Sequence, residues 1–257
     1  MSAEPLVSHS TAQVVRSGPA GPWRWSQVWR DVLFVHWKVS AKKLQELLPP
    51  GLELDTWEGQ AWASAVAFRL QNMRLRGFPS IWPVANLLEL NLRTYVRCHG
   101  EPGIFFLSMH ADNRLAIAFA RRLTPLPYQE ARINYTGVDE RTFQVSTSRE
   151  PLLTAEFKPL GECREAHPDS LDAWLLERYR AFVPNRRGEL LRMMVEHPPW
   201  QIQDATLNAA ALRLGEPWGI DLAGKPDLCH FSSGLSAHLW PFAAIEHAIF
   251  DLRVDTR

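Results

Sequence analysis

The fold is decided by the stretch Glu89-Leu90-Asn91-Leu92-Arg93-Thr94-Tyr95-Val96. Side chains alternate between the two faces of a β-strand, so Glu89, Asn91, Arg93 and Tyr95 share one face and the leucines and valine share the other. The polar face is either solvated, with Glu89 and Arg93 as a diagonal pair, or it points into a barrel lumen. In the lumen, a carboxylate, an amide, a guanidinium and a phenol would converge on a small polar ligand. The pattern alone leaves both interpretations open.

Outward from this strand, the chain consists of short strands at close spacing with a few helices between them. The expected strands are 52–57, 61–70, 88–98, 104–110, 130–137, 141–149, 153–158, 189–197, 228–233 and 235–241. The expected helices are 41–48, a segment from 113 to about 123, 171–182 and a segment near 204–214. Because no strand–helix–strand rhythm of about 30 residues occurs, we predict an α+β fold of predominantly antiparallel β structure, closed like a barrel.

The domain organisation follows from composition along the chain. Residues 1–22 are small and polar and end in Ser17-Gly18-Pro19-Ala20-Gly21-Pro22, which is typical of a disordered tail. We find no internal repeat and no linker after about residue 25, so we predict one domain over 23–257.

The overall charge and cysteine content exclude several classes of protein. The 257 residues carry 28 basic and 28 acidic side chains, which argues against a nucleic-acid binder. No apolar run approaches the roughly 18 residues that span a bilayer, and the N-terminus has no signal-peptide pattern. Three widely spaced cysteines fit a reducing compartment. We therefore expect a cytoplasmic protein that binds neither nucleic acid nor membrane, with a homo-oligomer left open.

Familiar catalytic and metal-binding motifs are absent from the sequence. There is no GxSxG, GxxxxGK, GxGxxG or HExxH pattern. The gaps between His230, His238 and His247 match no common ligand spacing, so we expect no metal and no cofactor. His197 shares a strand face with apolar residues and is interpreted as a buried core histidine. Arg121 and Arg122 end a predicted helix, where one of them complements the helix dipole.

Six short motifs in a fixed order resemble the uncharacterised YqjF-like family. They are Phe34-Val35-His36-Trp37, Leu47-Leu48-Pro49-Pro50-Gly51-Leu52, the stretch 89–96, Ala120-Arg121 with Leu126-Pro127-Tyr128, Glu177-Arg178-Tyr179, and His197-Pro198-Pro199-Trp200. The similarity runs from about Trp29 to about Trp240. This family looks like a branch of the acetoacetate-decarboxylase-like superfamily, so the resemblance implies an antiparallel barrel with peripheral helices and one central cavity.

The resemblance also implies which catalytic groups are present and which are missing. The decarboxylases carry a Schiff-base lysine beside a second lysine, just after a proline that follows a helix with an arginine. Here Tyr128 and Gln129 follow Pro127, so both lysines are replaced, whereas Glu89 and Arg121 match the cavity glutamate and the helix arginine. A Schiff-base decarboxylase is therefore not expected.

We predict that the cavity binds a small organic acid or carbonyl compound. The candidate ligand-binding residues are Asn91, Arg93, Tyr95 and Arg121, and the candidate catalytic residues are Glu89 and Tyr128. Arg93 or Arg121 would hold a carboxylate bidentately, with Glu89 as base and Tyr128 or Tyr95 as proton donor. A buried Arg93 would pair with Glu89, with a ligand anion, or with both. The alternatives are a ligand-binding or sensor protein without turnover, and a structural protein whose polar face is solvated.

Overall fold

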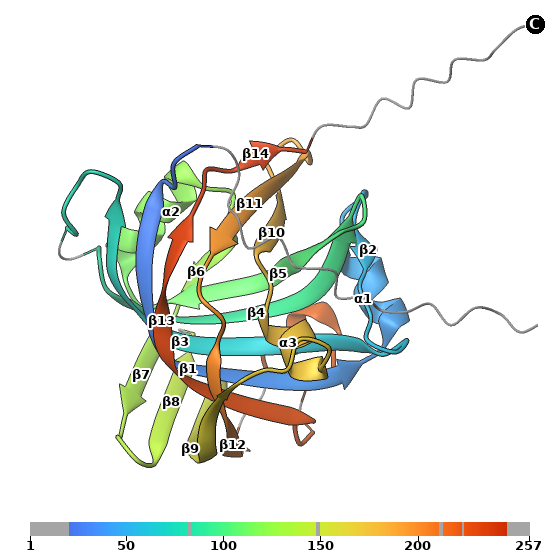
Figure 1. Ribbon diagram of the computed structural model, residues 1–257, viewed down its shortest axis with the longest axis vertical. Coiled ribbons are helices and arrows are strands. Elements are labelled where there is room, and N and C mark those ends of the chain that lie inside the picture. Colours follow the sequence, from blue (N-terminus) through green and yellow to red (C-terminus); the bar gives the residue numbers. More distant parts are fainter. Residues whose placement is uncertain (1–20, 82–83, 148–149, 211–212, 223, 246–257) are drawn as a thin grey trace, which may run out of the picture.

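The protein is built around one large, mostly antiparallel sheet that curls into a ring (Figure 1). The computed structural model describes residues 21–81, 84–147, 150–210, 213–222 and 224–245. Strands β11, β10, β5, β4, β3, β1 and β13 follow one another in the sheet, and β11 also pairs with β13, which closes the ring. Strands β12, β9, β8 and β7 continue the sheet beyond β13.

The strands and helices have the following bounds. The ring contains β1 (Trp25–Val39), β3 (Ala61–Leu75), β4 (Leu87–Cys98), β5 (Glu101–Ala111), β10 (Arg180–Pro184), β11 (Leu190–Glu196) and β13 (Leu228–Leu239). The extension contains β12 (Gln201–Ala210), β9 (Pro151–Glu165), β8 (Arg141–Ser146) and β7 (Arg132–Thr136), and the short strands are β2 (Glu53–Leu54), β6 (Tyr128–Glu130) and β14 (Ala243–Ala244). The helices are α1 (Ala41–Leu47), α2 (Arg114–Leu123), α3 (Leu171–Leu176) and a 3-10 turn over Glu216–Trp218.

Both faces of the ring strands are buried, in two separate cores. On β3, the small residues Ala63, Ala65 and Ala67 face outward into a core that includes Phe143 and Phe157 of the extension. Small side chains on this face allow the extension to pack closely against the ring. The alternate β3 residues, such as Val66 and Phe68, face the inner core, which lies inside the ring. The predicted fold class is confirmed: the fold is mostly antiparallel β with few helices.

The predicted helix starts are confirmed where an N-cap residue marks them. The side chains of Ser40, Asn113 and Ser170 each accept a hydrogen bond from the backbone N–H three residues on. No helix among the described residues is long and apolar enough to cross a membrane.

Two helix predictions are wrong in part or in full. The helix expected over 171–182 ends at Leu176, and the chain then turns into β10, which pairs with β5 and β11. Arg178 holds this turn, because its Nε donates to the Trp174 carbonyl while its Nη1 bonds Asp55. The segment near 204–214 is strand β12 as far as Ala210, because its backbone pairs with β9 along most of its length. Tertiary pairing overrides a weak helical pattern here.

Two expected strands near the C-terminus are one strand, β13, with an irregularity at Gly234. Gly234 has φ of 116°, and a Cβ atom there would lie 1.9 Å from the Trp29 carbonyl oxygen. Gly234 lies opposite Arg30, and the register between β1 and β13 is the same on both sides of this point. The glycine therefore lets β13 bend and continue rather than end. The predicted tail over 1–22 lies almost wholly outside the described residues, and the single-domain boundary stays a prediction.

Candidate functional site

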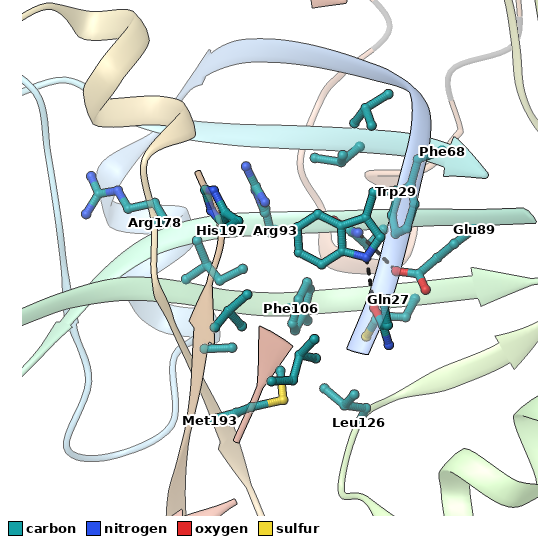
Figure 2. Close-up of a pocket in the computed structure, with 18 of the residues that line it drawn as sticks. Gln27, Trp29, Phe68, Glu89, Arg93, Phe106, Leu126, Arg178, Met193 and His197 are labelled. Carbon is teal, nitrogen blue, oxygen red and sulfur yellow. Dashed lines mark hydrogen bonds between the residues drawn. The ribbon is translucent and has the colours of Figure 1, made fainter. Parts of the chain in front are cut away.

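The ring encloses a cavity of about 110 Å³ at its inner core (Figure 2). Its walls come from strands far apart in the sequence, chiefly β1, β3, β4, β5, β11 and β13. The polar lining residues are Gln27, Glu89, Asn91, Arg93, Tyr128, Arg178, Arg180 and His197, and the aromatic ones besides Tyr128 are Trp29, Phe34, Phe68, Phe106 and Trp200. In Figure 2, Arg93 and His197 lie on one side, Glu89 and Gln27 on the other, and Trp29 lies between them.

Glu89 is the acidic group of the cavity. It is only 2% exposed, and both of its carboxylate oxygens accept hydrogen bonds. Tyr128 donates its hydroxyl to Oε2 at 2.8 Å, and Asn91 donates Nδ2 to Oε1 at 3.2 Å. The polar face of β4 thus points into the ring and not into solvent.

Burial controls the protonation of Glu89 and Tyr128. Desolvation raises the pKa of Glu89 to about 7, although the hydrogen bonds from Tyr128 and Asn91 act in the opposite direction. Burial, together with the neighbouring Glu89, raises the pKa of Tyr128 well above its usual value. Near neutral pH, Glu89 therefore exchanges a proton readily, while Tyr128 stays a hydrogen-bond donor.

Arg93 is the cation at the other side of the cavity. Its Nη2 reaches the Leu175 carbonyl at 3.5 Å, and its guanidinium lies 5.9 Å from the ring centroid of Phe34. Among the described residues, Arg93 makes no ion pair, and its buried Nε has no hydrogen-bond partner. A partly buried guanidinium with unused N–H groups is suited to bind an anion.

Of the partners considered for a buried Arg93, Glu89 does not form an ion pair with it. Four residues along one strand separate the two Cα atoms by about 13 Å, and Asn91 lies between them on the same face. Glu89 instead uses Asn91 and Tyr128 as its partners. The consequence is that the carboxyl and the guanidinium both stay available to a ligand.

Two further arginines line the cavity but already have carboxylate partners. Arg178 bonds Asp55 at 2.8 Å, and its guanidinium lies over the rings of Tyr95 and Trp174. Arg180 lies 3.5 Å from Glu101. Arg93 is therefore the lining arginine whose charge is not balanced by a direct carboxylate contact in the described part of the chain.

His197 lines the cavity, so its interpretation as a core histidine is incomplete. It is 6% exposed, and its Nδ1 lies 2.8 Å from the Pro198 carbonyl oxygen. Its ring stacks on Tyr179 at 4.6 Å and contacts Trp29 and Trp200. Burial lowers the pKa of His197, so the imidazole is neutral near pH 7.

The structure brings together four of the six predicted site residues, namely Glu89, Asn91, Arg93 and Tyr128. Tyr95 is not among the lining residues; its hydroxyl lies 2.6 Å from Ser64 Oγ and its ring contacts Trp174. Arg121 is exposed and donates Nε to the Tyr128 carbonyl at 2.8 Å. It therefore contacts the backbone that holds Tyr128 and does not reach the cavity.

The lining contains no lysine among the described residues. Lys38 is 55% exposed at its side chain and forms an ion pair with Asp227, as expected of a surface lysine. Within the described ranges, no cluster of three or more histidine, cysteine, aspartate or glutamate side chains is arranged to hold a metal.

Sequence reasoning missed His197, Trp29 and Trp200 as cavity residues. His197 and Trp200 belong to the motif His197-Pro198-Pro199-Trp200, which was used for the resemblance but given no role. Trp29 lies on β1, which was not predicted as a strand, although apolar residues occur along its length. Both faces of β1 are buried over much of its length, so polar and apolar residues do not alternate clearly along it.

The chain matches the DUF2071 family, described as an uncharacterized conserved protein, over residues 26–236. It is 39% identical to the uncharacterized protein YqjF of Bacillus subtilis (strain 168) over 228 residues, which is 88% of this chain and 94% of that protein.

Two solved structures share the fold. The acetoacetate decarboxylase of Legionella pneumophila superposes with a TM-score of 0.60 at 19% identity, covering 96% of this chain and 98% of that one. The enduracididine biosynthesis enzyme MppR, complexed with pyruvate, superposes with a TM-score of 0.60 at 16% identity, covering 90% and 93%. At these identities the similarity establishes the fold alone.

Proposed function

We propose that this chain, which belongs to the DUF2071 family and is similar to YqjF over nearly its whole length, is an enzyme that removes a proton from a small oxo acid and returns it. One observation carries the proposal: Glu89, buried and with a pKa raised to about 7, shares an enclosed cavity with Arg93, which has no carboxylate partner in the described chain. In this proposal, Arg93 and Glu89 contact opposite ends of one small ligand.

The size of the cavity restricts the ligand. An apolar protein cavity of about 150 Å³ holds benzene, so about 110 Å³ holds a molecule of some four to six non-hydrogen atoms. Pyruvate has this size, a carboxylate for Arg93 and a keto oxygen. The fold neighbour MppR has been solved with pyruvate, which makes pyruvate a reasonable probe.

The proposed reaction is removal of a proton from the carbon next to the carbonyl. Arg93 holds the carboxylate through paired N–H donors. Ionised Glu89 takes the proton as the C–H bond breaks, and the electron pair moves to the carbonyl oxygen, giving an enolate. As Glu89 is neutralised, Tyr128, kept protonated by burial, moves its hydroxyl hydrogen bond from Glu89 Oε2 to that oxygen. The proton on Glu89 then exchanges with one from solvent, and transfer of this solvent proton to the carbon restores the keto acid and ionised Glu89.

No covalent lysine chemistry enters this reaction. The residues that follow Pro127 are Tyr128 and Gln129, and the described lining holds no lysine. The cavity therefore supports acid–base chemistry through Glu89 and Tyr128 and gives no amine for a Schiff base.

The proposal is tested by exchange of the pyruvate methyl protons in D₂O, followed by proton NMR. The wild-type chain should accelerate the exchange over buffer, and the rate should rise with pH through about 7 as Glu89 ionises. Glu89→Gln should lose about 10² to 10⁴ of the rate. The matched control Glu46→Gln, at an exposed position on α1, should keep it. Equal rates for buffer and wild type would refute the enzymatic function.

A binding protein without turnover is the second candidate. It is favoured by the observation that each oxygen of Glu89 already accepts a hydrogen bond, which weakens the carboxylate as a base. In that case pyruvate would bind in an Arg93-dependent manner but its methyl protons would not exchange faster than in buffer.

A further inference from the structure

The surroundings of His197 suggest a second role for this side of the cavity. Two charged side chains act on its ring, Arg93 on β4 and Glu177 after α3. The other groups packed against the ring are Tyr179, Trp29 and Trp200, which are uncharged near neutral pH.

The Glu177 side chain is fixed near His197 by two hydrogen bonds. It accepts hydrogen bonds from the Tyr179 hydroxyl and, at 2.9 Å, from the Trp200 backbone N–H. Without ligand, Arg93 and Glu177 balance each other around a neutral imidazole. A monoanion at Arg93 leaves this region with one net negative charge, which is costly in a cavity of low dielectric.

The backbone around His197 is already arranged for a second proton on the ring. Nδ1 lies 2.8 Å from the Pro198 carbonyl oxygen, which can only accept, so the single N–H of the neutral ring lies on Nδ1. A second proton goes to Nε2, and the backbone groups of Pro198 and Arg178 favour the charged ring that results.

Arg93 and burial together keep the ring neutral in the absence of ligand. A bound anion cancels the field of Arg93 at His197, which removes one of these two effects. The remaining neighbours, Glu177 and the two backbone groups, all favour the imidazolium.

We propose that His197 takes up a proton when a carboxylate binds at Arg93, so that the cavity binds its ligand as an anion together with a proton. The inference rests on the proposed function and adds His197 to its binding residues. It also predicts the ligand class: a monoanion, whose charge Arg93 and one acquired proton can balance.

Glu89 could also cause proton uptake when the ligand binds. Its pKa is already near 7, and an anion in the cavity raises it further, so Glu89 also binds protons when ligand binds. The Glu89→Gln variant removes this contribution, because an amide does not titrate. Proton uptake that persists in Glu89→Gln and disappears on further replacement of His197 identifies the histidine.

The experiment is calorimetric titration of the full chain with pyruvate at pH 6.5 in buffers of different ionisation enthalpy. In Glu89→Gln, we expect uptake of about half to one proton per pyruvate, and an affinity that falls by up to about tenfold per pH unit above 6.5. In Glu89→Gln with His197→Asn, both effects should vanish. The matched control adds His99→Asn, at an exposed position whose φ of 50° asparagine tolerates, and should retain the uptake.

The outcomes separate the two proposals. If pyruvate binds to Glu89→Gln without proton uptake, or if uptake survives His197→Asn, the role of His197 is refuted while the proposed function stands. If pyruvate does not bind to the wild type at all, both fail. Should the His197 variant not fold, nitrogen-15 NMR of labelled histidine in Glu89→Gln decides: the His197 resonances must move to imidazolium values on addition of pyruvate, and unchanged resonances refute the role.

Discussion

Replacing Glu89 with glutamine should change the pH dependence of stability in a defined direction. In the folded protein, Glu89 keeps its proton up to about pH 7, whereas in the unfolded chain it loses the proton near its ordinary value of 4.5. Between these values the folded state binds more protons than the unfolded state. The contribution of Glu89 to stability is therefore fully present below about pH 4.5 and is lost as the pH rises toward 7.

The size of the effect follows from the difference between the two pKa values. A shift from 4.5 to about 7 corresponds to about 3 kcal/mol of unfolding free energy, since each pKa unit is worth about 1.4 kcal/mol. Glutamine has the shape of the protonated acid and does not titrate. Its amide can still accept from Tyr128, and it can donate to Asn91 Oδ1, which has no hydrogen-bond partner among the described residues.

The assay is urea unfolding of wild type and Glu89→Gln at pH 5, 6, 7 and 8. The variant should be more stable than wild type by about 1 kcal/mol at pH 5, and this difference should grow to about 3 kcal/mol at pH 8. Taking the difference between the two chains cancels the opposite trend of His110, whose pKa is lowered by burial to about 4. A difference that is constant across this range would refute the burial of an ionisable Glu89.

Three further predictions concern Arg93, the lysines and Arg121. Arg93→Met should abolish pyruvate binding in calorimetry and destabilise the unliganded protein by about 1–3 kcal/mol, because it removes the donor to the Leu175 carbonyl and the cation that balances Glu177; unchanged stability would contradict this charge balance. Acetoacetate followed by borohydride should leave no mass increase on any lysine, and an adduct found by peptide mapping would restore a Schiff-base mechanism. Arg121→Gln should slow pyruvate exchange more than it weakens binding, since Arg121 holds the backbone of Tyr128, whereas Arg122→Gln should do neither; equal effects of the two would count against this positioning role.

The strand 89–96 allowed much of the fold and part of the site to be predicted. Its alternation assigned Glu89, Asn91 and Arg93 to one face, and the structure turns that face into the cavity. Local rules were equally reliable at helix starts, where Ser40 and Asn113 form their capping hydrogen bonds. These features depend on neighbours in the sequence, which a pattern can represent.

The remaining features depend on contacts between distant segments. Tyr95 shares the polar face, but Ser64 on the neighbouring strand binds its hydroxyl and keeps it out of the cavity lining. His197 looked like a core residue because its strand neighbours are apolar, and the fact that the core contains a cavity is a property of the closed ring. Arg93 likewise has no carboxylate in direct contact among the described residues. Asp55 contacts Arg178 instead, and this pairing joins residues far apart in the chain.

The most direct test of the account is a crystal structure of the chain grown with pyruvate. The account predicts pyruvate inside the ring, with its carboxylate within hydrogen-bond distance of the Arg93 guanidinium and its keto oxygen directed toward Tyr128 and Glu89. An empty cavity at saturating pyruvate, or pyruvate bound with its carboxylate away from Arg93, would contradict it.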